Sequence, residues 1–270
     1  MGVNSVAMDF EEESNLHCYG EYICIVQLYD QKHYYILDAL QLAKTQAGID
    51  ALRTFLEGPI EKIMFACQSD AALARKTLNI QIQNVFDIRI IAIALGFTGN
   101  LTALIQRSLG IEDENPSQKK KYQTANWMIR PLSAQQIQYA LSDVKHLFAL
   151  KASLTAEMSR TLPRGRQNQI RHQMLTCALP KHPDRPGWEK ICNFRMLTPT
   201  QRIYLKHFFL ARDSLARAAN LPANRILEKQ LLVDMAKRST WVGVLPPDKN
   251  DLSPIFEQAR LSAMAELLAP

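Results

Sequence analysis

The order of strand-like and helix-like segments in residues 1–150 is the feature that most restricts the fold. Three strand-like segments follow one another with short connections, and two later ones are separated by a helix-like segment. The five segments are residues 3–10, 22–29, 34–37, 61–67 and 84–86. Short connections are typical of antiparallel neighbours, and an intervening helix is typical of a parallel crossover. The pattern therefore predicts an α/β fold with a mixed sheet.

Acidic residues stand beside apolar runs in this part of the chain. Asp9 and Glu11 are two residues apart in a strand-like segment, so their side chains point to the same face. Asp70 begins the helix-like run 71–78, directly after the apolar stretch 60–66. An ionised carboxylate in such surroundings is costly unless something pairs with it. Converging carboxylates would hold divalent cations, and two cations side by side are suited to phosphodiester cleavage.

Tyr139 and Asp143 form a third group. Residues 133–150 have helical spacing and are predicted as one helix, on which Tyr139 and Asp143 are neighbours because they are four residues apart. Each group also has an ordinary structural alternative. The alternatives are a solvent-facing acidic strand end for Asp9, Glu11, Glu12 and Glu13, a helix N-cap for Asp70, and a helix-surface hydrogen bond for Tyr139 with Asp143.

Taken in this order, the three groups resemble the motifs of the ribonuclease D branch of the DEDD 3′→5′ exonucleases, in the subclass whose third motif is Tyr-x3-Asp. The sequence around the third motif carries most of this resemblance. The matching stretches are residues 121–127, 130–133 and 138–140, with further matches at 27–28, 36–38 and 84–87. The resemblance implies a ribonuclease-H-like mixed-sheet exonuclease domain.

The resemblance also implies a mechanism. Asp9, Glu11 and Asp143 would hold one Mg²⁺ or Mn²⁺ ion, and Asp9 would bridge to a second ion that Asp70 holds through water. Tyr139 would orient the attacking water, which makes it the fifth catalytic residue. The expected reaction removes nucleoside 5′-monophosphates from the single-stranded 3′ end of an RNA, with tRNA precursors as the expected substrates.

Two positions depart from the family pattern. Phe65 stands where the second motif usually carries a His, and Asn126 stands where the family often has Asp before Trp127. Neither position is a predicted metal ligand, so the activity stays predicted. Trp127 and Arg130 are expected to have structural roles, in packing and in ion pairing, and not catalytic ones. Asp87 is expected to cap the helix that follows it and is left out of the site.

The carboxyl-terminal part has a resemblance of its own. Residues 187–190 and 197–239, above all the stretch 205–217, resemble one HRDC domain, an all-α module of helicases and ribonuclease D. The predicted organisation is an exonuclease domain at 1–160, a basic linker at 161–193 and the HRDC helical domain at 194–270.

Charge is distributed unevenly between the two parts. Residues 1–150 hold 13 Lys and Arg against 16 Asp and Glu, whereas residues 151–270 hold 19 against 10. The acidic part is suited to cations and the basic part to a polyanion such as RNA. A solvated linker face is the alternative for the basic segment 160–195.

Composition restricts the location and the chemistry. The five cysteines are far apart, without a Cys-x-x-Cys pair, which favours reduced cytosolic thiols and argues against a zinc site. No stretch of 18 apolar residues and no secretory signal is found, so a cytoplasmic protein without a membrane span is expected. A monomer is favoured.

Three classes of function remain open at this point. The first is an exoribonuclease, and the second is a 3′→5′ DNA exonuclease of the same fold. The third is a non-catalytic RNA-binding scaffold, against which the complete set of acidic residues argues. A contact to the ribose 2′-OH separates the first two, but backbone groups can make it.

Overall fold

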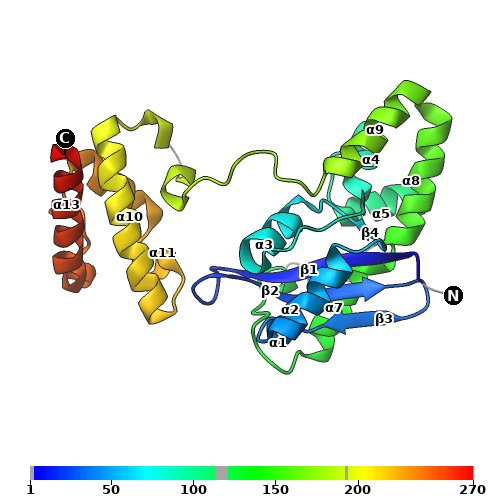
Figure 1. Cartoon of the computed structure of the whole chain (residues 1–270), viewed down its shortest axis with the longest axis horizontal. Helices are drawn as coiled ribbons and strands as arrows, with labels where there is room; N and C mark the ends of the chain where they lie inside the picture. The colour runs from blue at the N-terminus through cyan, green and yellow to red at the C-terminus, as the bar shows by residue number, and fades with distance from the viewer. Residues whose placement is uncertain (1–2, 113–120, 192–193, 270) are drawn as a thin grey trace. The chain divides into compact units, whose positions relative to one another are not determined.

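A computed structural model describes residues 3–112, 121–191 and 194–269 of the chain (Figure 1). The chain divides into two compact units. The first contains the residues up to 13 together with 21–181, and the second contains 14–20 together with the residues from 182 onward.

The first unit is built on a five-stranded mixed sheet with strand order β3-β2-β1-β4-β5. The strands are β1 (Ser5–Ser14), β2 (Glu21–Tyr29), β3 (Tyr34–Leu37), β4 (Glu61–Met64) and β5 (Val85–Asp87). β2 and β3 are antiparallel, whereas β4 is parallel to both β1 and β5. The predicted α/β class and mixed sheet are therefore confirmed.

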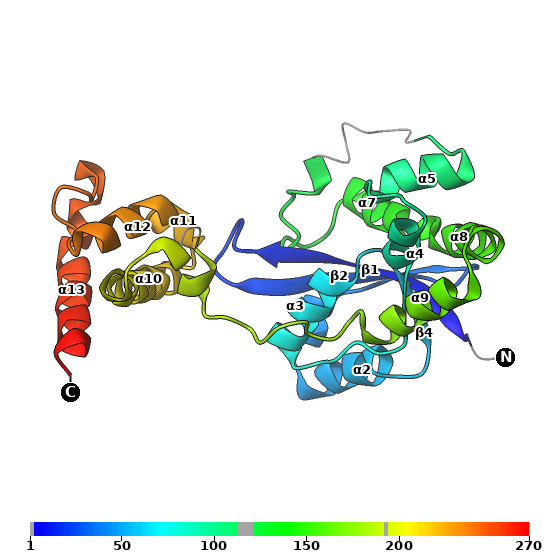
Figure 2. The same cartoon turned by 90° about the horizontal axis from the view of Figure 1, so that it is seen from above.

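Helices cover both faces of this sheet (Figure 2). On one face lie α1 (Ala39–Leu42), α2 (Gln46–Leu56) and α3 (Gln68–Leu78). On the other lie α4 (Ile88–Ala94), α5 (Leu101–Leu109), α7 (Ala134–Lys145), α8 (Leu147–Thr161) and α9 (Arg164–Thr176). β1 is covered from both sides, because Met8 packs into one core and Ala7 into the other. Two of its acidic residues, Glu11 and Glu13, are therefore buried.

Two predicted elements have different bounds in the structure. β1 continues to Ser14, so Asp9 and Glu11 lie within the strand and not at its end. The helix predicted at 133–150 is two helices, because His146 adopts φ −102° and ψ 0° between α7 and α8. The apolar spacing continues across this residue into α8, so the sequence pattern does not reveal the break.

The segment predicted as a basic linker, 161–193, is not one extended connection. Helix α9 occupies its first half and packs against α4, α8 and β5. Its Ile170 is 1% exposed. This part of the segment therefore belongs to the first unit, while the domain boundaries themselves stay a prediction.

The second unit is helical, as predicted. Its helices are α10 (Pro199–Ala219), α11 (Ala223–Ile226), α12 (Lys229–Arg238) and α13 (Ser253–Leu268), with short 3-10 turns η1 (Gly187–Lys190), η2 (Phe194–Met196) and η3 (Pro247–Leu252). α10 begins with a capping box between Thr198 and Gln201. Its Phe208 and Phe256 of α13 meet in the core with ring centroids 6.1 Å apart. None of the helices in the described ranges is both long and apolar enough to cross a membrane.

Lys62 is a buried lysine in the core of the first unit. This β4 lysine is fully buried, its Nζ donates to the Gly58 carbonyl oxygen over 2.8 Å, and no carboxylate pairs with it among the described residues. Burial lowers its pKa to about 8. In the unfolded chain Lys62 has its ordinary pKa of 10.5. Between pH 8 and 10.5 the unfolded state therefore binds more protons than the folded state. Stability therefore rises with pH across that interval.

We expect Lys62→Met to raise the free energy of unfolding at pH 7 by about 2 kcal/mol, after the loss of the hydrogen bond to Gly58 is counted. The gain should shrink as the pH rises from 8 towards 10.5, because the wild-type lysine is then neutral in the folded state. Urea unfolding at several pH values measures it, with Lys44→Met at an exposed lysine as the control. A gain that does not change with pH would contradict this account of Lys62.

Candidate functional site

The first two predicted site residues lie on the central strand β1. Asp9 and Glu11 are two residues apart and share one face of the strand, as predicted. Glu11 is 9% exposed, and Nε2 of Gln27 on β2 lies 3.5 Å from Glu11 Oε1. A central strand with both faces covered gives these carboxylates a fixed backbone and little water.

Asp70 lies in the first turn of α3. The N-cap of this helix is Cys67, which makes no side-chain cap, so the alternative of Asp70 as an N-cap is wrong. The tight corner before α3 includes Ala66, whose φ is 62°. The Asp87 carboxylate stabilises this corner, because it accepts the N–H groups of Ala66 over 2.9 Å and Cys67 over 3.1 Å. Asp87 also accepts the N–H of Arg89 and caps α4, as predicted.

Tyr139 and Asp143 lie one turn apart on α7, and Asp143 is 9% exposed. The ring of Tyr139 packs against Tyr122 and Trp127, with ring centroids 5.6 and 6.0 Å away. Trp127 is 1% exposed, which confirms its predicted packing role.

The loop before α7 is fixed by an ion pair. Arg130 Nε lies 2.7 Å from Asp38 Oδ2, and the same guanidinium donates to the backbone oxygens of Cys24 and Trp127. The structural pairing predicted for Arg130 is thus confirmed. Ser133 then begins α7 with a capping box that includes Gln136.

The electrostatics bring the five predicted residues together. Burial raises the pKa of Asp9 well above its usual range, and the charges of Asp70, Asp143 and Glu11 raise it further. Burial, followed by the charges of Asp143 and Asp70, raises the pKa of Glu11 to about 9. The pKa of Tyr139 is raised by burial, then by the charges of Asp143, Glu11 and Asp9. These effects show that the five groups lie close enough to interact electrostatically; Glu11 and Asp143 are buried, whereas Asp9, Asp70 and Tyr139 are partly exposed.

Asp70 also responds to acids outside the predicted set. Burial, followed by the charges of Glu12 and Asp87, raises its pKa to about 7. Glu13 is 1% exposed, so the exposed acidic surface expected of Glu12 and Glu13 is wrong for Glu13. Gln27 and Asp87 are further residues that the sequence did not assign to the site. Both residues fall in stretches of sequence that match the family, and this match could have pointed to them. Their contacts with Glu11 and Cys67, however, are formed only in the folded chain.

The donor set of the site suits hard cations. Its ligands are carboxylate oxygens, which Mg²⁺ and Mn²⁺ prefer, and cations would remove the repulsion that raises the pKa of Asp9 and Glu11. Three His, Cys, Asp or Glu side chains can share one metal ion only if their ligand atoms lie close together. Among the described residues, a group of three with ligand atoms within 4.8 Å of one another is found only at Cys67, Asp87 and Cys177. The four carboxylates are therefore spaced more widely than that group, which is consistent with their repulsion.

Residues 2–159 match the 3′-5′ exonuclease family. This match covers more than half of the chain, so the chain belongs to the 3′-5′ exonuclease family. The relatives are of the ribonuclease D type, which confirms the predicted branch.

One relative is the ribonuclease D of Nitrobacter hamburgensis, with 27% identity over 228 residues, which cover 81% of this chain and 56% of that protein. The chain spans a little over half the length of such relatives. Among solved structures, ribonuclease D of Escherichia coli is similar with a TM-score of 0.72, 20% identity, 99% of this chain and 70% of that chain. NrnC of Brucella melitensis with bound Mg²⁺ has a TM-score of 0.52 and 23% identity over 65% of this chain and 82% of that chain. These two likenesses concern the fold alone.

Tyr139→Phe tests whether the hydroxyl of Tyr139 takes part in the chemistry. The change keeps the ring that packs against Tyr122 and Trp127, so the fold and the binding of nucleic acid should hold. If the hydroxyl orients the attacking water, single-turnover cleavage should slow by roughly 10–10³-fold. Tyr122→Phe removes a hydroxyl from the same aromatic cluster and serves as the control. Weakened binding with unchanged cleavage of bound substrate would make Tyr139 a packing residue only.

Proposed function

We propose that this protein is a 3′→5′ exoribonuclease that releases nucleoside 5′-monophosphates one at a time from RNA. The observation that carries the proposal is that Asp9, Glu11, Asp70 and Asp143 lie close enough for their charges to interact, with Tyr139 one helical turn from Asp143. No described Ser, Lys or Cys is paired with a base in that region, so covalent catalysis has no support there. Hydrolysis assisted by divalent cations is the chemistry that such a set performs.

Two Mg²⁺ or Mn²⁺ ions fit these residues. Asp9, Glu11 and Asp143 would hold one ion, while Asp9 and Asp70 would hold the other, Asp70 through water. When bound, the ions lower the pKa of the attacking water and neutralise charge on the phosphate oxygens. Tyr139 keeps its proton because its pKa is raised, so its hydroxyl donates a hydrogen bond to a water or to a phosphate oxygen.

The substrate class is proposed as RNA with a single-stranded 3′ end, such as a tRNA precursor. Two observations support it: relatives of this chain are ribonuclease D proteins, and residues 151–270 carry a net charge of +9. Lys and Arg bind phosphates without reading sequence, so this part would contribute affinity. The sequence resemblance of the second unit to an HRDC module agrees with this role.

Asp9→Asn tests the cation chemistry. Asp9 would touch both ions, so cleavage should fall by at least ~10³-fold, and EDTA should abolish wild-type cleavage until Mg²⁺ or Mn²⁺ is added. Asp50→Asn makes the same chemical change on the exposed part of α2 and should cleave normally. Undiminished cleavage by Asp9→Asn would remove the basis of the proposal.

A pair of 3′-labelled strands of one sequence, one RNA and one DNA, tests the substrate class. Exonucleolytic attack from the 3′ end should release the label as a mononucleotide at the first cut, and RNA should be the faster substrate. A circular RNA is the control, because it has no 3′ end and should stay intact. Faster cleavage of DNA would favour the DNA exonuclease alternative, and binding of RNA without cleavage of either strand would favour a scaffold.

A further inference from the structure

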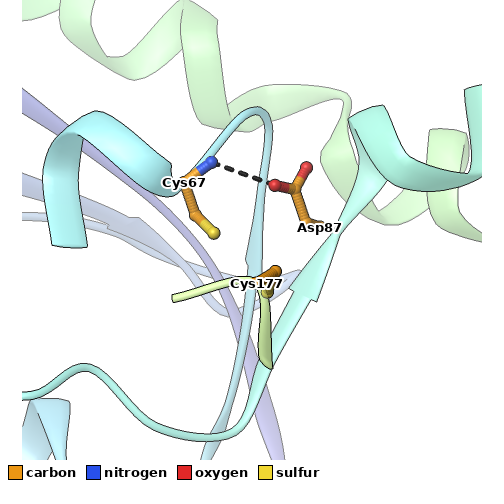
Figure 3. A group of neighbouring side chains, drawn as sticks. All are labelled: Cys67, Asp87 and Cys177. Atoms are coloured by element: carbon orange, nitrogen blue, oxygen red, sulfur yellow. Dashed lines mark hydrogen bonds between the residues drawn. The ribbon is translucent and has the colours of Figure 1, made fainter. Parts of the chain in front are cut away.

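Three ligand-type side chains meet beneath the corner that carries Asp70, and the nuclease chemistry uses none of them (Figure 3). Cys67 lies at the start of α3, Asp87 at the end of β5, and Cys177 directly after α9. One ligand atom of each lies within 4.8 Å of the other two. All three residues are buried, with exposures of 0%, 3% and 5% respectively.

We propose that Cys67, Cys177 and Asp87 bind a zinc-class divalent cation. Two thiolate sulfurs select a soft cation such as Zn²⁺ over Mg²⁺, and a carboxylate oxygen is also a usual zinc ligand. Binding releases the two thiol protons to solvent, because thiolates are the ligands. None of these three residues is one of the four carboxylates proposed to hold the nuclease cations, and the donor chemistry differs, although the charge of Asp87 also acts on Asp70.

The distances favour a bound cation over a disulfide. With Zn–S of about 2.3 Å and tetrahedral angles, ligand atoms around zinc are about 3.5–4 Å apart. Side chains whose ligand atoms already lie within 4.8 Å therefore need to move by about 1 Å or less. A disulfide requires the two sulfurs to approach to about 2 Å and leaves the Asp87 carboxylate without a role toward them.

Asp87 has one acceptor position left for a cation. A carboxylate offers about four lone-pair positions. Three are used by the N–H groups of Ala66, Cys67 and Arg89, and the Cys67 thiol is within hydrogen-bond reach of the carboxylate, so a cation would take the place of that thiol proton. The Asp87 oxygen nearer the thiols can thus bind a cation while the corner and the cap of α4 stay intact.

The position of Cys177 shows what a cation would hold together. The carbonyl oxygen of the next residue, Ala178, accepts hydrogen bonds from Arg75 Nη1 over 2.5 Å and Gln81 Nε2 over 3.0 Å. These hydrogen bonds hold the chain just after α9 against α3 and against the segment that follows α3. A cation shared by Cys67 and Cys177 would fix this end of the helix to the corner before Asp70.

The experiment measures zinc in the full-length protein. Wild type, Cys177→Ala and the control Cys24→Ala are purified from zinc-containing medium and dialysed against a weak chelator, and zinc is counted by mass spectrometry of the elements. Cys24 is also a buried cysteine but lies in a different core, with its sulfur 3.6 Å from that of Met128. We expect one zinc per chain in wild type and Cys24→Ala, and none in Cys177→Ala.

Asp9→Asn separates this proposal from the proposed function. The Asp9→Asn variant should lose cleavage and keep its zinc. If the zinc were held by the nuclease carboxylates, this variant would lose the zinc as well. Cobalt loaded in place of zinc should give a thiolate-to-metal charge-transfer band in wild type that is absent in Cys177→Ala. Hydrogen exchange at the end of α9 should quicken when zinc is removed from wild type.

Two results would overturn the proposal. One is a folded wild type that holds no zinc and gives no cobalt band, in which case the thiols are only hydrogen-bonded. The other is a wild-type mass lower by two hydrogen atoms with no reactive thiol at Cys67 or Cys177, which would identify a disulfide.

Discussion

The mutual repulsion of buried carboxylates is the constraint on which the rest of the first unit depends. Asp9 and Glu11 have raised pKa values because they are buried and because neighbouring acids bear the same charge. Such a cluster opposes folding unless the surrounding elements hold it in place. Three different elements do so: the central strand β1, the first turn of α3, and α7 with its aromatic cluster. Part of the stability of the scaffold thus offsets the repulsion that the proposed cations would relieve.

A single carboxylate, Asp87, organises the most strained part of this scaffold. It accepts backbone N–H groups from Ala66, Cys67 and Arg89, so it joins the corner before α3 to the start of α4. Ala66 has a left-handed backbone conformation that costs an alanine about 1 kcal/mol, and these hydrogen bonds offset that cost. The direction of the Asp70 side chain follows from this corner, because Asp70 comes directly after it in the first turn of the helix.

Residues that share one strand or helix could be predicted to lie together from the periodicity of that element. Residues far apart in the sequence could not. The pairs Asp9 with Glu11 and Tyr139 with Asp143 follow from strand and helix spacing alone. The break at His146 is invisible to that spacing, because the apolar pattern of α7 continues in α8. The group of Cys67, Asp87 and Cys177 is equally invisible, since its members are 20 and 90 residues apart and only the tertiary fold joins them.

Phe65 bears on how protons are handled near the site. It directly follows β4, at the position where the sequence resemblance predicts a His, and it is partly buried in the same core as α4. The guanidinium of Arg89 lies 5.7 Å from the centre of its ring, so a cation contacts this position where an imidazole would otherwise stand. An imidazole changes charge between pH 5 and 8, whereas a phenyl ring does not. Proton transfer during hydrolysis would therefore rest on water and the carboxylates, whereas Tyr139, whose raised pKa makes it keep its proton, would act as a hydrogen-bond donor beside Asp143.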